Sequence, residues 1–174
     1  RLSVSFINNN FNFVCMNNVN SFLINWSIRF LENKDTIRKE IVSVEKSNDG
    51  FDFAVHYKDK VKYFVIMPVL ENGIFSKIKD DIYISFITLN NMPNVKFVVN
   101  EWENLTKFKF LNIYFVNPFS SSDKVWIICP YVHDKICSKA SLELGLKSMA
   151  EMVEAIDAEG LSNKIKLLRE ESGL

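Results

Sequence analysis

Hydrophobic spacing predicts a helix near the start of the chain. Apolar residues recur every three or four positions from Val19 to Asn33, which indicates an amphipathic helix with one buried face. Upstream of it, Leu2–Ile7 and Phe11–Met16 alternate between apolar and polar residues, and Asn8–Asn10 between them are typical of a turn. These two segments are therefore predicted to form a pair of strands.

A different pattern follows, with strict alternation and many β-branched and aromatic residues. It predicts three strands, in Lys39–Lys46, Phe51–Tyr57 and Val61–Val69. Asn48-Asp49-Gly50 and Lys58-Asp59-Lys60 have the composition of the turns that would join them.

The middle of the chain is ambiguous over Ile74–Leu89, where apolar residues fit both a helix stripe and a strand. The length of the segment and its charged start favour a helix, which Pro93 would end. Beyond it, Val95–Trp102, Phe110–Val116 and Lys124–Cys129 are predicted strands.

The clearest helical pattern lies near the carboxyl end of the chain, over Ser138–Ala158, with Ser138 as its cap and Gly160 as its stop. Ser162 begins a short last helix. The apolar stripe of the longer helix either packs onto a sheet or pairs with the same helix of a second copy, and we expect a homodimer formed through it. The stripe consists of Leu142, Leu146, Met149, Val153 and Ile156.

These elements predict a single α/β domain over residues 1–174, with a mixed β-sheet flanked by helices, extra strands and a C-terminal helix. Hydrophobic residues make up 48% of the chain and charged residues 24%, which is the balance of a globular domain.

Charge gives no overall support to nucleic-acid binding, because 21 basic residues balance 21 acidic ones. Lys58, Lys60 and Lys62 form a local basic patch around one predicted turn, and the plainer interpretation of this patch is a solvated strand end.

Cysteine content and hydropathy bear on location. Cys15, Cys129 and Cys137 are too few for a secreted disulfide scaffold, so we expect a reducing, cytoplasmic compartment. The longest apolar run, Tyr63–Leu70, is eight residues, far short of the ~20 that cross a bilayer. No membrane association is expected.

The predicted order from Val19 to Trp102 is helix, three strands, helix, strand, and about half the chain resembles the core of the PD-(D/E)XK nuclease superfamily, the restriction-endonuclease-like fold. In that superfamily an Asp begins the second strand and Glu-x-Lys lies in the third. Asp52, in the segment Gly50–Val55, matches the Asp, whereas the positions of Glu-x-Lys hold Ile66-Met67-Pro68.

The resemblance implies the fold of these nucleases without their chemistry. Two carboxylates of the superfamily hold a divalent cation and the Lys activates water, so a chain without the Glu and the Lys is expected to be a non-catalytic binding or assembly module with no cofactor. The competing hypothesis is a divergent nuclease that uses Mg²⁺ or Mn²⁺, with Glu45 or Glu71 in place of the missing carboxylate beside Asp52.

A third hypothesis concerns the stretch from Cys129 to Cys137. Its Cys-x3-His-x3-Cys pattern could ligate zinc through Cys129, His133 and Cys137 if a fourth ligand came from elsewhere. The stretch also follows a strand and precedes the clearest helix, a place where α/β proteins often bind small molecules. The plainer interpretation is an aromatic edge of the core. The residues that would line such a small-molecule site are Trp126, Tyr131, His133 and Asp134.

Overall fold

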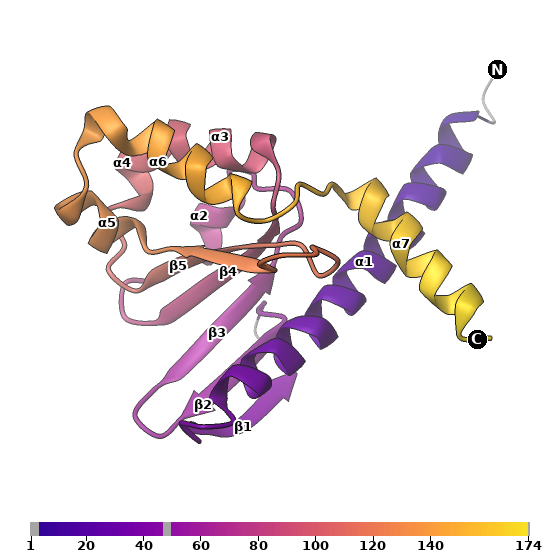
Figure 1. Ribbon diagram of the computed structural model, residues 1–174, viewed down its shortest axis with the longest axis horizontal. Coiled ribbons are helices and arrows are strands. Elements are labelled where there is room, and N and C mark those ends of the chain that lie inside the picture. Colours follow the sequence, from indigo (N-terminus) through magenta and orange to yellow (C-terminus); the bar gives the residue numbers. More distant parts are fainter. Residues whose placement is uncertain (1–3, 47–49, 174) are drawn as a thin grey trace.

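A mixed sheet between two layers of helices forms the body of the protein (Figure 1). The computed structural model describes residues 4–46 and 50–173. The strands within these ranges are β1 Ile41–Lys46, β2 Phe53–Tyr57, β3 Val61–Ile66, β4 Tyr83–Leu89, β5 Leu111–Val116 and β6 Val125–Ile128. The helices are α1 Val4–Asp35, α2 Ile74–Lys77, α3 Met92–Asn100, α4 Trp102–Leu105, α5 Pro130–Ile136, α6 Lys139–Glu151 and α7 Ala158–Glu171.

The strands lie in the sheet in the order in which they occur in the chain, so that β1 and β6 are the edges. Neighbours β3, β4 and β5 run parallel, whereas β1–β2, β2–β3 and β5–β6 pair antiparallel. The predicted α/β class and mixed sheet are confirmed.

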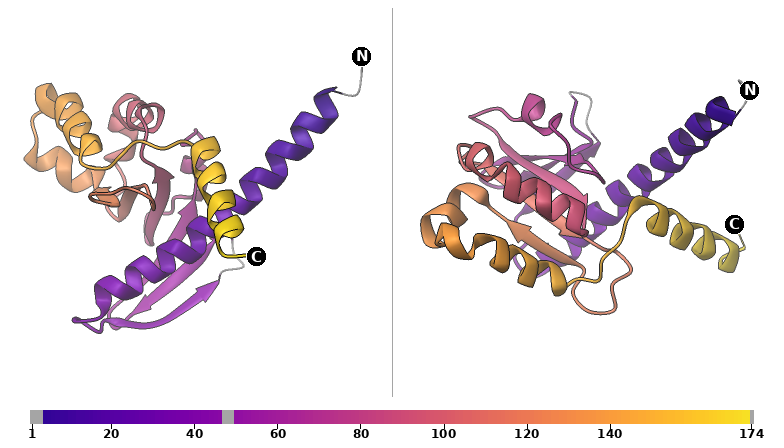
Figure 2. Two further views of the ribbon diagram at one scale, coloured as in Figure 1. Left: turned by 45° about the vertical axis from the view of Figure 1, so that its right-hand side comes forward. Right: turned by 90° about the horizontal axis from the view of Figure 1, so that it is seen from above.

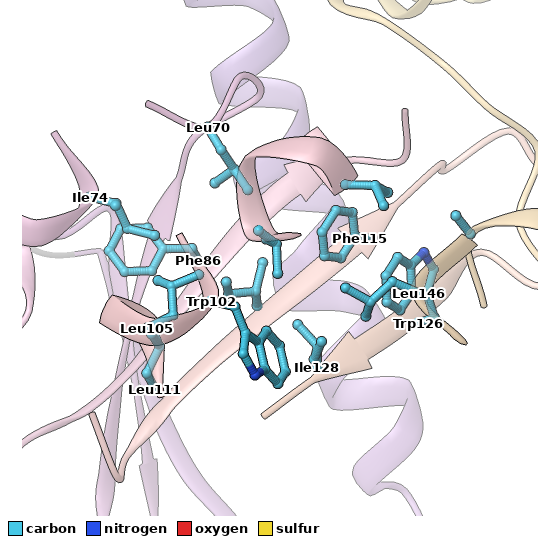
Figure 3. Packing of buried hydrophobic residues seen from close by; sticks show 14 of the residues in the cluster. Leu70, Ile74, Phe86, Trp102, Leu105, Leu111, Phe115, Trp126, Ile128 and Leu146 are labelled. Carbon is cyan, nitrogen blue, oxygen red and sulfur yellow. The ribbon is translucent and has the colours of Figure 1, made fainter. Parts of the chain in front are cut away.

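Both faces of the central strands are buried, which explains their almost continuous apolar sequence. Successive residues point to opposite faces, so that Val65 enters one core and Phe64 the other. The first core lies under α2, α3, α4 and α6, and Figure 3 shows its aromatic and aliphatic side chains meeting between helices and sheet. The second lies between the sheet and α1, with α7 packed beside α1.

The predicted helix at Val19–Asn33 is confirmed as part of α1, but the strand pair predicted upstream of it is wrong. Residues 4–16 are helical and continue directly into the predicted helix, while residues 1–3 lie outside the described residues. Ile7, Phe11 and Val14 also recur at helical spacing, and extending an existing helix needs no new nucleus. The first half of α1 projects beyond the sheet (Figure 2).

Three of the predicted strands before Ile74 are confirmed, with shorter bounds, as β1, β2 and β3. Of the turn predicted at Asn48-Asp49-Gly50, the first two residues lie outside the described part of the chain. Gly50 has a φ of 81°, a left-handed conformation that glycine adopts without steric cost.

The helix predicted over Ile74–Leu89 is mostly wrong, because only Ile74–Lys77 is helical and Tyr83–Leu89 is strand β4. A strand buried between two parallel neighbours is apolar on both faces, and such a run also fits a helix stripe. The tertiary pairing with β3 and β5 decides the outcome.

The strand predicted over Val95–Trp102 is also wrong, because this segment belongs to α3 and α4. Pro93 lies in the first turn of α3, where proline is tolerated, so it helps to start a helix instead of ending one. The Asn91 side chain caps α3 by accepting a hydrogen bond from the Asn94 N–H.

The strands predicted at Phe110–Val116 and Lys124–Cys129 are confirmed as β5 and β6. The helix predicted over Ser138–Ala158 is confirmed only as far as Glu151, where α6 ends. Gly160 does not stop it; its N–H donates to Asp157 Oδ1 in the first turn of α7, which therefore begins before the predicted Ser162.

Candidate functional site

Asp52, the residue that carries the nuclease resemblance, is held at the end of the β2–β3 hairpin. Its Oδ2 accepts a hydrogen bond of 2.7 Å from the backbone N–H of Ile66, and its own N–H donates to the Phe64 carbonyl at 2.9 Å. Ile66 is the residue that the predicted resemblance places at the position of the superfamily's Glu. The carboxylate therefore fastens one strand to the next.

The two carboxylates predicted as substitutes lie on other parts of the surface. Glu45 is on edge strand β1, where its Oε2 lies 3.4 Å from His56 Nε2, and Glu71 is exposed in the loop after β3. Among the described residues, no three His, Cys, Asp or Glu side chains are grouped so that they could hold a metal ion. Glu45 and Glu71 as catalytic ligands with Mg²⁺ or Mn²⁺ stay a prediction.

The carboxyl ends of β3, β4 and β5 are the edge at which open α/β sheets usually bind ligands. In this protein, buried asparagine side chains occupy that edge and hydrogen-bond the loops that meet there. Asn94 is 1% exposed; its Oδ1 accepts from Leu70 N–H at 2.8 Å, and its Nδ2 donates to the Pro68 and Leu89 carbonyls at 2.9 Å each. The amide thus ties the end of β3 to the end of β4.

A second buried asparagine closes the same edge toward α6. Asn90, also 1% exposed, donates from Nδ2 to the carbonyls of Ala150 and Val153, at 2.9 and 2.7 Å. Its Oδ1 accepts a 2.6 Å hydrogen bond from Trp126 Nε1. Both ends of each amide are committed to protein groups, because a buried amide without partners would be costly.

An open apolar groove of about 480 Å³ lies between β6, α5 and α6. We call it the β6–α6 groove. Three consecutive residues of β6 line it, although neighbours in a strand face opposite sides of the sheet, so the groove follows the free edge of the strand. The side chains that form its apolar wall include Trp126, Ile127, Ile128, Leu142, Leu144, Leu146 and Met149.

Of the four residues predicted to line a small-molecule site, Trp126 and His133 line this groove and Tyr131 and Asp134 do not. Trp126 is mainly a core residue, 5% exposed and stacked on Phe115 at 4.1 Å. Asp134 turns toward the other side of α5, where its Oδ1 accepts from Trp102 Nε1 at 2.9 Å. The structure therefore brings two of the four predicted residues to the groove.

His133 sits at the first turns of α5, and its ring orientation is set by the backbone. Its Nδ1 accepts a 2.9 Å hydrogen bond from the N–H of Cys129, which leaves the proton on Nε2. Cys137 is exposed and lines the groove, while Cys129 is partly buried and burial raises the pKa of its thiol. Zinc binding by these three residues stays a prediction.

Sequence reasoning missed the most exposed apolar side chain that lines the groove, Leu144, which is 70% exposed. Leu144 lies outside the apolar stripe of α6. An apolar residue on the otherwise polar face of a predicted helix is the sequence signal that could have identified this exposed surface. Most of the predicted stripe is buried within the single chain, because Leu146, Val153 and Ile156 pack against the sheet and neighbouring helices.

No family model, curated protein or solved structure matches this chain. Over the described residues, no helix has the length and apolar character needed to span a bilayer.

Proposed function

We propose that this chain is a non-catalytic domain of nuclease-like fold that serves as an assembly module, and that a second copy of the chain occupies the β6–α6 groove. The observation that carries the proposal is the free edge of β6 beside an exposed apolar surface. Exposed apolar patches of this kind mark interaction sites more often than isolated apolar residues do.

The nuclease-like part of the proposal draws on the element order. The order helix, three strands, helix, strand is present as α1, β1–β3, α2 and β4, although the last strand is Tyr83–Leu89 and not the segment that was predicted. The non-catalytic part draws on Asp52, whose carboxylate is bound to the Ile66 N–H where the superfamily would have a second carboxylate.

Edge strands favour a second copy as the occupant. In the described structure β6 pairs only with β5, so one row of its backbone N–H and C=O groups is available to another strand. Two identical edge strands can pair antiparallel about a two-fold axis, and the free backbone N–H and C=O groups of each strand then form hydrogen bonds with those of the other.

The chemistry of the lining favours the same occupant. The groove contains no Asp, Glu, Lys or Arg among its lining residues. Two identical copies of a neutral surface meet without like-charge repulsion, and their exposed apolar side chains lose contact with water together. Leu144 and Met149 of α6 and Ile127 of β6 would contribute most, because they are exposed in the single chain.

Light scattering over a range of concentrations tests this assembly. The expected mass is twice the 20.2 kDa of one chain, and Leu144→Glu is expected to return it to the single-chain value because the variant buries an unpaired carboxylate. Val42→Glu is the matched control, since Val42 lies on the opposite edge strand β1 and is 68% exposed, against 70% for Leu144.

Two results would contradict the proposal. One is a wild-type mass of a single chain at every concentration up to the solubility limit. The other is dissociation of the dimer by Val42→Glu as readily as by Leu144→Glu, because the interface would then lie elsewhere.

A further inference from the structure

A second, polar cavity of about 500 Å³ lies at the other end of the sheet, between the end of α1, the start of β1, the end of β2 and the start of β3. We call it the α1–β3 cavity. The second half of α1 runs along the sheet in contact with β1 and β3 (Figure 1). This cavity is on the face opposite α6, so it is separate from the β6–α6 groove.

Basic residues outnumber acidic ones around the cavity. Lys34, Arg38, Lys60 and Lys62 line it, against Asp35 and Glu40. Asp35 is committed to the turn into β1, where its two carboxylate oxygens accept from the backbone N–H groups of Glu40 and Ile41 at 3.1 and 2.8 Å.

The cations are poorly matched by protein carboxylates. Lys60 pairs with Asp59 at 2.8 Å. In the described part of the chain, Lys34, Arg38 and Lys62 form no ion pair. Lys62 is partly buried, and desolvation followed by the nearby Lys60 lowers the pKa of its ammonium. A charged group held in this way gains free energy when an anion replaces its lost water.

Two tyrosines supply hydrogen-bond donors to the same cavity. Tyr114 is 9% exposed and lines it, and among the described residues its hydroxyl has no hydrogen-bond partner. Burial raises the pKa of Tyr114 and of Tyr57, with Asp35 and Glu40 adding to the effect at Tyr57, so both hydroxyls stay protonated.

We propose that the α1–β3 cavity binds a small molecule that joins a phosphate group to a flat aromatic body, such as a nucleoside monophosphate. Lys62 and the planar guanidinium of Arg38 would bind the phosphate oxygens, with the tyrosine hydroxyls as further donors. Leu31, Ile41 and the two tyrosine rings provide the apolar wall for the aromatic body. A bare inorganic anion would leave most of the volume unfilled.

Calorimetric titration with adenosine monophosphate and with adenosine tests the phosphate requirement. The monophosphate is expected to bind at least about tenfold more tightly, since each charge-assisted hydrogen bond changes affinity by about that factor. Inorganic phosphate is expected to compete weakly, because it makes the same polar contacts without the apolar ones.

Three variants locate the site. Lys62→Gln and Arg38→Gln are each expected to weaken monophosphate binding about tenfold. Lys58→Gln, on the same turn as Lys60 but not lining the cavity, is the matched control and is expected to leave binding within about twofold. Arg38 is exposed, so its variant keeps the test valid if Lys62→Gln does not fold.

The proposal is overturned by equal affinities for adenosine and its monophosphate, by no binding of the monophosphate at millimolar concentration, or by an equal loss in the Lys58 variant. It is independent of the assembly proposal, because Leu144→Glu is expected to leave monophosphate binding unchanged.

Discussion

The two ends of the central sheet differ in whether their polar side chains are paired with other groups of the protein. At the carboxyl ends of β3 and β4, Asn90 and Asn94 are buried. The side-chain oxygen and nitrogen of both residues form hydrogen bonds with protein groups. At the amino end of β3, Lys62 and Tyr114 line a cavity. Among the described residues the Lys62 ammonium has no carboxylate partner and lies over the Tyr57 ring, and the Tyr114 hydroxyl has no hydrogen-bond partner.

The difference shows that a polar side chain near a strand end points to a ligand-binding site only when its polar atoms have no partner within the protein. Asparagine has one acceptor and two donors within a short reach, so it can bridge loops that meet at the end of a sheet. In this protein the edge where α/β folds usually bind ligands is used to join those loops. At the opposite end, Lys34, Arg38 and Lys62 form no ion pair within the described part of the chain.

The largest expected effect comes from the closed end. Asn94→Ala removes three buried hydrogen bonds and leaves the Leu70 N–H without its acceptor, so it is expected to lower the free energy of unfolding by about 3 kcal/mol or more. Urea denaturation measures this. Asn100→Ala, exposed at the end of the same helix, is the control and is expected to change stability by less than about 0.5 kcal/mol. A similar loss of stability in both variants would contradict the prediction that the buried hydrogen bonds of Asn94 stabilise the fold.

Asp52 tests whether the same end holds a catalytic carboxylate. Asp52→Ala removes the acceptor of the Ile66 N–H and is expected to cost about 1–2 kcal/mol of stability, with a smaller loss for Asp52→Asn, which keeps an acceptor oxygen. The melting temperature of the wild type is expected to be the same with and without Mn²⁺. A rise with Mn²⁺ that Asp52→Asn abolishes would instead favour the metal-dependent nuclease.

The smallest expected effect is at the open end. Lys62→Met removes a partly desolvated charge, so at neutral pH it is expected to raise the free energy of unfolding by a few tenths of a kcal/mol after solvent screening is allowed for.

The pH dependence of this effect has a defined sign. The folded-state pKa of Lys62 lies below its unfolded value of 10.5, so between the two the unfolded chain binds more protons and wild-type stability contributed by this group rises with pH. The advantage of Lys62→Met should therefore shrink as pH rises toward that value. Denaturation of both proteins across this range measures it, and an advantage that grows with pH would contradict the assignment.

Much of the fold could be predicted from local patterns. The helix at Val19–Asn33 and the strands at β1, β2, β3, β5 and β6 carry a clear period, because one face of each is buried or the run is rich in β-branched residues. The errors fall where two periods fit equally well. Tyr83–Leu89 is apolar on both faces because it is the middle of three parallel strands, and no local signal distinguishes that from a buried helix.

The candidate sites depended still more on tertiary structure. Lys60 and Lys62 stood out in the sequence as a basic turn, but Arg38, Tyr57 and Tyr114 join them only because β1, β2 and β5 bring distant segments together. The β6–α6 groove likewise combines the edge of β6 with Leu144 of α6. Neither set of neighbours has a sequence spacing that marks it.

The sequence by itself therefore determined the α/β class, most of the elements and the positions of the reactive residue types, because burial imposes a period on each local segment. Only the tertiary structure decided which polar groups are satisfied. Whether Asp52 meets a backbone N–H, or Lys62 a carboxylate, depends on segments far apart in the chain. Hydrogen bonding and desolvation act over a few ångströms in space, whatever the separation in sequence.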